Sequence, residues 1–148
     1  MTTGRVGTSA IEALWAGGLV PIRDALHLAS GVSVGAKLDP GTARGVAFLE
    51  PFDLAAELSA DPGLVTAVDT QHQVHLPGGG GTVCCGEAAQ GADGFCARLG
   101  DDGRLRWLLL LTGANPFTDI RVQSGRLVRF RSTSGVELTV DLADPSQT

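Results

Sequence analysis

Six short apolar segments in the second half of the chain constrain its fold more than any other feature of the sequence. Residues 118–123 and 136–142 alternate between apolar and polar side chains, as strands with one buried and one exposed face do. Sequences rich in Gly, Ser and Asp, which favour turns, separate the segments. This pattern predicts an antiparallel meander with strands at 82–87, 94–99, 104–112, 118–123, 126–131 and 136–142.

The apolar faces also predict how the last three strands pair. Matching them across the turns gives three expected pairs: Val122 with Val128, Ile120 with Phe130, and Phe130 with Val136. The same register places Arg129 opposite Glu137 on the exposed face. The run 107–111 is apolar on both faces, so we expect a central strand that the N-terminal helices cover.

Two short helices are predicted in the first part of the chain. Ser9 and Glu12 have the spacing of a capping box at the start of the first helix, and Gly17 follows its last apolar residue. The second helix is expected after Pro21, where apolar residues recur at helical spacing up to a stop at Gly31. Two helices joined by a glycine turn would allow a helix-turn-helix. Its second helix offers few cations, namely Arg23 and His27, which disfavours DNA binding.

The middle of the chain has a mixed pattern. Residues 45–49, 64–68 and 73–76 read as strands, and Asp53 is a suitable N-cap for a brief helix over 54–58. We therefore predict one α+β domain over 1–148, in which short N-terminal helices pack on an antiparallel meander of about five to seven strands. Its expected parts are a helical segment 1–43, a mixed segment 44–81, the meander 82–142 and a tail 143–148.

The charge of the chain is concentrated in its first two thirds. The 148 residues carry a formal net charge of -5, and residues 1–97 hold four basic residues against ten carboxylates. This balance disfavours broad nucleic-acid binding, which requires a basic face, and favours a basic partner.

The sequence also bears on location and cofactors. No apolar run approaches the roughly 20 residues of a membrane helix, and the first residues lack the apolar segment of a secretory signal. We therefore expect a cytoplasmic protein without a membrane partner, whose three cysteines remain thiols. A core of this size forms without a metal, so no cofactor is expected.

Cysteine and histidine residues gather near the glycine-rich run 78–81. The run lacks the Gly-Lys-Ser/Thr ending of a phosphate loop and is expected to be a flexible connector. The preferred interpretation is that all three cysteines are small buried hydrophobes, with Cys85 opposite Cys96 across two strands. Two alternatives stay open, a small enzyme or a ligand-binding domain. A metal site would use His72, His75, Cys85 and Cys96, whereas a nucleophilic enzyme would use Cys85, His72 and Asp69.

The C-terminal segment carries a family resemblance. Arg106-Trp107, Asn115-Pro116-Phe117, the run 132–135 and Asp141-Leu142 resemble small uncharacterised proteins of high-GC bacteria, some of which are similar to immunity proteins of polymorphic toxins. The resemblance covers 103–142 and contains no catalytic residues. It implies an acidic, enzymatically inert protein that binds a toxin tightly.

Charge and resemblance together favour one function. We expect a non-catalytic interaction module that meets a basic partner protein through acidic residues of its first two thirds, chiefly Glu50, Asp53, Glu57, Asp61 and Asp69.

Overall fold

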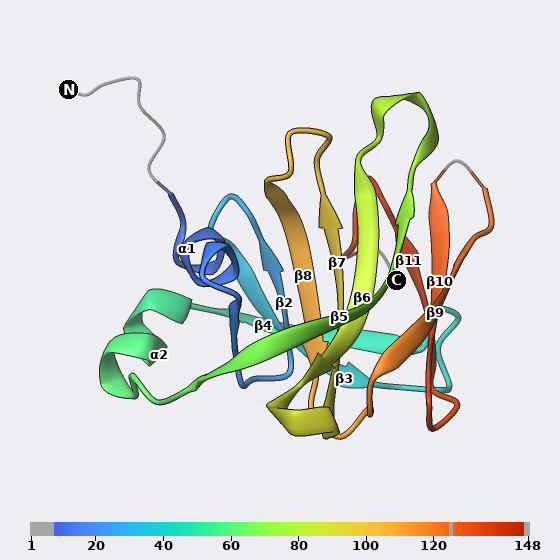
Figure 1. The fold of residues 1–148 in the computed structure, drawn as a ribbon. Helices are drawn as coiled ribbons and strands as arrows, with labels where there is room; N and C mark the ends of the chain where they lie inside the picture. Colours follow the sequence, from blue (N-terminus) through green and yellow to red (C-terminus); the bar gives the residue numbers. More distant parts are fainter. Residues whose placement is uncertain (1–7, 125, 147–148) are drawn as a thin grey trace.

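The computed structural model describes residues 8–124 and 126–146 and shows a mixed α+β fold (Figure 1). Its described part contains two α-helices, α1 (Ala10–Ala16) and α2 (Leu54–Ala60), and 11 strands. The strands are β1 (Leu19–Pro21), β2 (Ala25–Leu28), β3 (Ser33–Leu38), β4 (Val46–Phe52), β5 (Val65–His75), β6 (Thr82–Ala88), β7 (Asp93–Leu99), β8 (Leu105–Leu111), β9 (Phe117–Val122), β10 (Leu127–Ser132) and β11 (Glu137–Asp141). The two short 3-10 turns are Pro77–Gly79 and Ala89–Gly91. The expected α+β class and antiparallel pairing are confirmed. The predicted number of strands, about five to seven, is too low, because the described part of the chain has 11.

The strands form two antiparallel sheets. A curled sheet of eight strands has the order β1-β5-β6-β7-β8-β2-β3-β4, and a sheet of three has the order β11-β10-β9. The two sheets also meet at a seam, where Thr139 N on β11 donates a hydrogen bond to Arg44 O beside β4 at 3.0 Å. On its other side the small sheet packs through β9 against β5 and β6. The strands therefore nearly encircle a common core.

Two apolar clusters separate three layers. One lies between the sheets and includes Trp107, Leu109 and Phe130, whereas the other lies between the large sheet and the helices and includes Ile11 and Leu108. In Figure 1 the helices stand on one side of the large sheet and β9 to β11 on the other. Strand β8 is buried on both faces as expected, but the helices cover only one of them. The small sheet covers the other.

The first helix begins and ends as predicted. The Ser9 hydroxyl accepts a hydrogen bond from Glu12 N at 3.3 Å, and a Glu12 carboxylate oxygen accepts one from Ser9 N at 3.2 Å. These bonds satisfy N–H groups that have no partner within the helix. Trp15 then packs edge-on against Phe95 of β7, with ring centroids 5.7 Å apart. The capping box therefore fixes a helix that closes one face of the large sheet.

The prediction of a second helix is wrong, because these residues form a strand. Without this helix there is no helix-turn-helix in this segment. Residues 25–28 form β2, which pairs with β8 on one side and β3 on the other. Leu26 enters the core between the sheets, whereas His27 packs against Phe52 on the other face. A strand buried on both faces shows a nearly continuous apolar run, which helical spacing also allows. Neighbouring strands therefore decided the conformation, rather than the local pattern.

In the middle of the chain the predicted helix is confirmed, whereas two of the predicted strands differ from those observed. Asp53 caps α2, with Oδ1 accepting a hydrogen bond from Ala56 N at 3.1 Å. The two strands expected at 64–68 and 73–76 are one long strand, β5, with an irregularity between Thr70 and His72 where it pairs with β6. This irregularity interrupts the alternation of buried and exposed residues by which one continuous strand would be recognised.

The predicted pairing of the last three strands is confirmed between β9 and β10 and wrong between β10 and β11. Val122 lies opposite Val128 and Ile120 opposite Phe130, as expected. Across the next turn, however, Phe130 pairs with Leu138 instead of Val136, and Arg129 pairs with Thr139 instead of Glu137. Ser132 closes a three-residue turn in which its hydroxyl accepts a hydrogen bond from Val136 N at 3.1 Å. That turn moves the register by two residues.

Candidate functional site

The carboxylates of the first two thirds of the chain divide into structural and exposed groups. Glu12 belongs to the capping box and to an ion pair with Arg104 at 3.0 Å. Asp24 accepts a hydrogen bond from the backbone N–H of Thr112, and the buried Asp93 accepts one from Gly113 N at 3.2 Å. These three carboxylates accept hydrogen bonds from backbone or side-chain donors within the fold.

The exposed acids gather on β4 and α2. Glu50, Asp53 and Asp61 are exposed, and the half-buried Glu57 pairs with Arg23 at 3.3 Å. We name these four carboxylates, Glu50, Asp53, Glu57 and Asp61, the β4–α2 acidic surface. Arg23 is its only ion-pair partner in the described part of the chain. Three of the four charges therefore lack a cationic partner there.

Asp69 belongs to a different element from the other four predicted acids. It is exposed on β5 and lies opposite Glu87 of β6 in the strand register. Its carboxylate accepts a hydrogen bond from Gln71 Nε2 at 3.3 Å. Asp69 and Glu87 carry like charges directly opposite one another on the sheet, and such charges repel. The two carboxylates form a second acidic region, separate from the β4–α2 acidic surface.

A free sheet edge borders the β4–α2 acidic surface. Strand β4 is the last strand of the large sheet, and Leu49 within it is 52% exposed. Pro51 also lies in β4, where the lack of an N–H is tolerated because the strand is at an edge. The region thus combines an edge strand, an exposed apolar side chain and negative charge.

The cysteines are buried in two different layers. Cys85 lies opposite Cys96 as predicted, and both belong to the core between the sheets, whereas Cys84 faces the helices. All three are free thiols. Burial raises the pKa of Cys84 and of Cys85 to about 12. A thiol that stays protonated is a poor nucleophile and a poor metal ligand.

The histidines do not converge with these thiols. His72 lies opposite Cys85 in the register of β5 and β6, but it is exposed whereas Cys85 is fully buried. His75 is also exposed, and its Nδ1 lies 3.0 Å from the Thr82 hydroxyl. No group of three or more His, Cys, Asp or Glu residues in the described ranges 8–124 and 126–146 could hold a metal ion.

His27 is a buried polar residue that the sequence did not single out as a site. Its Nδ1 lies 2.8 Å from the Ser33 hydroxyl, and its Nε2 has no partner among the described residues. Burial, and then the charge of Arg23, lower the pKa of His27 to about 4. Arg23 stacks on the Phe52 ring, with its guanidinium carbon 3.7 Å from the ring centroid. The neutral histidine belongs to the packing beneath α2.

The glycine-rich run is held in place by side chains and backbone. Gly80 O accepts hydrogen bonds from Arg98 Nη2 at 2.9 Å and Nε at 3.3 Å. Leu76 N donates to Gly81 O at 2.7 Å, which closes the loop at its base. A strand follows rather than a helix, as predicted, so the loop has no helix N-terminus to attract phosphate.

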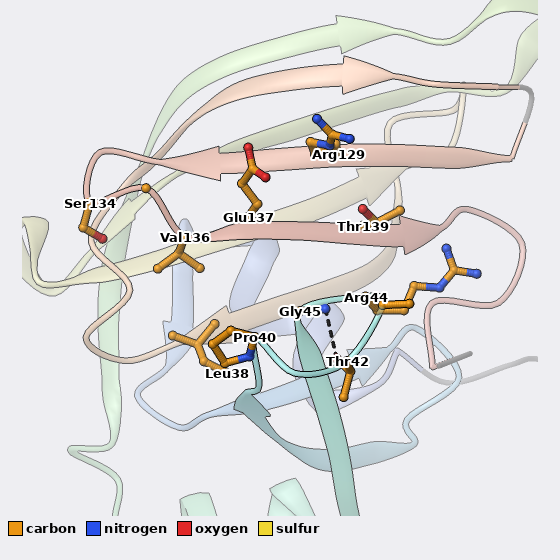
Figure 2. Close-up of a pocket in the computed structure, with 12 residues that line it drawn as sticks. Leu38, Pro40, Thr42, Arg44, Gly45, Arg129, Ser134, Val136, Glu137 and Thr139 are labelled. Carbon is orange, nitrogen blue, oxygen red and sulfur yellow. Dashed lines mark hydrogen bonds between the residues drawn. The ribbon is translucent and has the colours of Figure 1, made fainter.

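A concave region lies at the seam between the sheets. A pocket of about 520 Å³ is bordered by the loop before β4 and by β10 and β11 (Figure 2). Gly45 N donates to the Thr42 hydroxyl at 3.0 Å, and Gly45 comes so close to Glu137 O that a Cβ atom would overlap it. Arg44, Arg129 and Glu137 line this pocket, so charges of both signs meet there.

The geometry therefore offers an acidic edge and one concave region lined in part by arginine, and it leaves the thiols buried. No helix in the described residues is both long and apolar enough to cross a membrane. Comparison of the chain with models of known protein families, with curated proteins and with solved structures gave no match.

Proposed function

We propose that this protein is a non-catalytic interaction module that binds a basic partner protein through its β4–α2 acidic surface. One observation carries the proposal. Between Arg44 and Arg98 the chain has seven carboxylates and no Lys or Arg, and the exposed members on β4 and α2 border a free sheet edge. Opposite charge on a partner would accelerate encounter and select against other acidic proteins.

The free edge supplies contacts that charge alone cannot. A partner segment paired with β4 would gain backbone hydrogen bonds, and Leu49 would supply apolar area. Glu50 lies next to Leu49 in the same strand, so charge and apolar contact meet within one element. An apolar contact bordered by charge is the usual arrangement of a protein interface.

The resemblance of residues 103–142 supports the same kind of partner. Proteins of the immunity type are acidic and bind a toxin without catalysing a reaction, and we propose a toxin-type basic partner met in the cytoplasm. The negative charge of this surface disfavours nucleic acid as the partner, because nucleic acid itself is negatively charged.

The alternative, an enzyme or ligand-binding domain built on Cys85, His72 and Asp69, has less support. It requires an accessible thiol, and Cys85 is buried with a raised pKa. In the described part of the chain no hydrogen bond joins these three side chains. A catalytic arrangement would need a nucleophile and base within reach of one another.

The test begins with capture of the partner and ends with kinetics. Proteins bound to the tagged chain in an extract of its own host are identified by mass spectrometry. Each candidate is then purified, and its association rate is measured by surface plasmon resonance from about 50 to 300 mM NaCl. We expect a basic partner whose association slows steeply as salt rises.

The variant Glu50→Gln/Asp53→Asn/Asp61→Asn removes three negative charges and keeps the shapes of the three side chains. Asn caps a helix as well as Asp does, and Glu57 is left in place because it pairs with Arg23. We expect this variant to associate about tenfold more slowly at low salt, with a flatter salt dependence. The control Asp119→Asn/Glu137→Gln changes the small sheet and should leave the rate unchanged. A triple variant with the rate and salt slope of the wild type would refute the proposal.

A further inference from the structure

A cavity of about 540 Å³ opens at the end of the sheets where the glycine-rich loop lies. The turn between β7 and β8 and the segment that follows β11 complete its wall, and its lining includes Arg98, Arg106 and Trp107. None of these residues belongs to the β4–α2 acidic surface. The cavity is therefore independent of the proposed function.

Arg98 is held rigidly in the wall of this cavity. Its Nε and Nη2 donate to Gly80 O, and its Nη1 donates to Leu142 O at 2.8 Å. These bonds use three of the five N–H groups of a guanidinium. Two N–H groups thus remain to bind a ligand, on a side chain that is already oriented.

Arg106 brings a second positive charge to the same cavity. Its guanidinium lies against Gly100, where an added Cβ would be 2.7 Å from Nε and Nη2. Partial burial, and then the charge of Arg106, lower the pKa of Arg98. Neither arginine pairs with a carboxylate among the ion pairs of the described residues. The two neighbouring cations repel each other, and an anion bound between them would relieve this repulsion.

Trp107 also lines this wall, although its indole N–H is enclosed within the core. The residue is 2% exposed, and its Nε1 has no acceptor in the described part of the chain. Indole N–H and guanidinium groups donate hydrogen bonds and accept none. Two carboxylates, Asp101 and Asp144, also line the cavity, but both belong to exposed residues.

We propose that this cavity binds the oxyanion group of a small ligand, a carboxylate or a phosphate, through Arg98 and Arg106. A planar guanidinium can bind either group through two parallel hydrogen bonds. The exposed Asp101 also lines the cavity and opposes binding by its negative charge. The remaining volume would accept the body of the ligand beside Leu28 and Trp107.

The test uses Trp107 as the reporter. The variant Trp15→Phe leaves Trp107 as the only tryptophan, and its fluorescence is followed during titration with inorganic phosphate and, separately, with succinate. NaCl at matched ionic strength serves as the blank. We expect a saturable change with at least one of the two anions, and the anion that binds more tightly identifies the oxyanion. No saturable change with either anion would overturn the proposal.

Two further substitutions locate the site. Arg106 is exposed, so Arg106→Gln should fold, and we expect it to weaken binding by at least about tenfold. Asp101→Asn should strengthen binding, because it removes a negative charge from the wall. Arg131→Gln, a change on an exposed residue of the small sheet, is the matched control and should bind as the wild type does. Equal binding by Arg106→Gln and the wild type would refute the site.

Discussion

The Nδ1 atom of His27 lies 2.8 Å from the hydroxyl oxygen of Ser33, and neither side chain is open to solvent. The two residues face each other across β2 and β3, and the His27 ring packs edge-on against Phe52, whose centroid is 6.0 Å away. A charged imidazole at this position would lose its hydration and stand beside Arg23. The fold therefore requires His27 to stay neutral.

This requirement predicts a loss of stability in mild acid. The unfolded chain takes up a proton at His27 near its ordinary pKa of 6.5, whereas the folded chain does so only near 4. The contribution of His27 is therefore complete above pH 6.5 and declines as the pH falls toward 4, by about 3 kcal/mol in all. Urea unfolding measured across this pH interval should show the decline.

A double variant isolates the contribution of His27. His27→Leu/Ser33→Ala replaces both partners with apolar groups, so neither is left without a hydrogen bond. We expect its stability to change less with pH between 6.5 and 4 than that of the wild type. The exposed His72→Gln variant should keep the full decline. A double variant as sensitive to pH as the wild type would show that other groups cause the effect.

The thiols should resist modification in the folded protein. Burial raises the pKa of Cys84 and Cys85 to about 12 and the pKa of Cys96 well above its ordinary value, so few thiolates are present at pH 8. We expect no rapid reaction with Ellman's reagent before denaturant is added, and reaction of all three thiols afterwards. The variant Ser59→Cys places a thiol on the exposed side of α2 and should react at once. A native thiol that reacts as fast as this control would contradict the prediction.

Gly94 should tolerate no side chain. An added Cβ would overlap Asn115 O and lie 2.7 and 2.8 Å from two atoms of the Phe117 ring, at the point where the chain crosses between the sheets. Gly94→Ala should therefore lower the free energy of unfolding by about 2 to 3 kcal/mol, as measured in urea. At Gly17 the nearest such atom is 3.5 Å from the added Cβ and φ is -91°, so Gly17→Ala should change stability by less than about 0.5 kcal/mol. Similar losses in both variants would argue against the steric cause.

The N-cap of α2 provides a test of that helix. Asp53→Ala removes the acceptor for Ala56 N and should destabilise the protein by about 1 kcal/mol. Asp53→Asn keeps an acceptor at this position and should retain most of the stability. Thermal unfolding followed by circular dichroism distinguishes the two variants. Equal destabilisation would mean that the charge, rather than the hydrogen bond, holds the helix.

The features that could be predicted from the sequence depend on neighbours in the chain. The capping box of Ser9 and Glu12, the cap at Asp53 and the pairing of β9 with β10 all involve residues separated by a short turn or less. The expected loop between these two strands also correctly placed Cys85 opposite Cys96. In each case one local rule is sufficient.

The features that could not be predicted depend on distant partners. Strand β2 takes its conformation from β8, far along the chain, and the same apolar spacing fits a helix. The separation of β9 to β11 as a second sheet follows the crossing at Asn115, whose φ of 66° is uncommon for a residue other than glycine. The arginine-lined cavity joins segments that no sequence window contains. The acidic residues can be listed from the sequence, but the position of β4 at the edge of the sheet depends on the pairing of distant strands.

The hydrogen bond from Thr139 N to Arg44 O joins β11 to the loop before β4, about 95 residues earlier in the chain. During synthesis on the ribosome, β3 and β4 are therefore made long before the element that closes the ring with them. A nascent chain that stops short of β11 would leave the core between the sheets open to water along this line. Closure of this core must wait for β11, and truncations that remove β11 should be far more damaging than their length suggests.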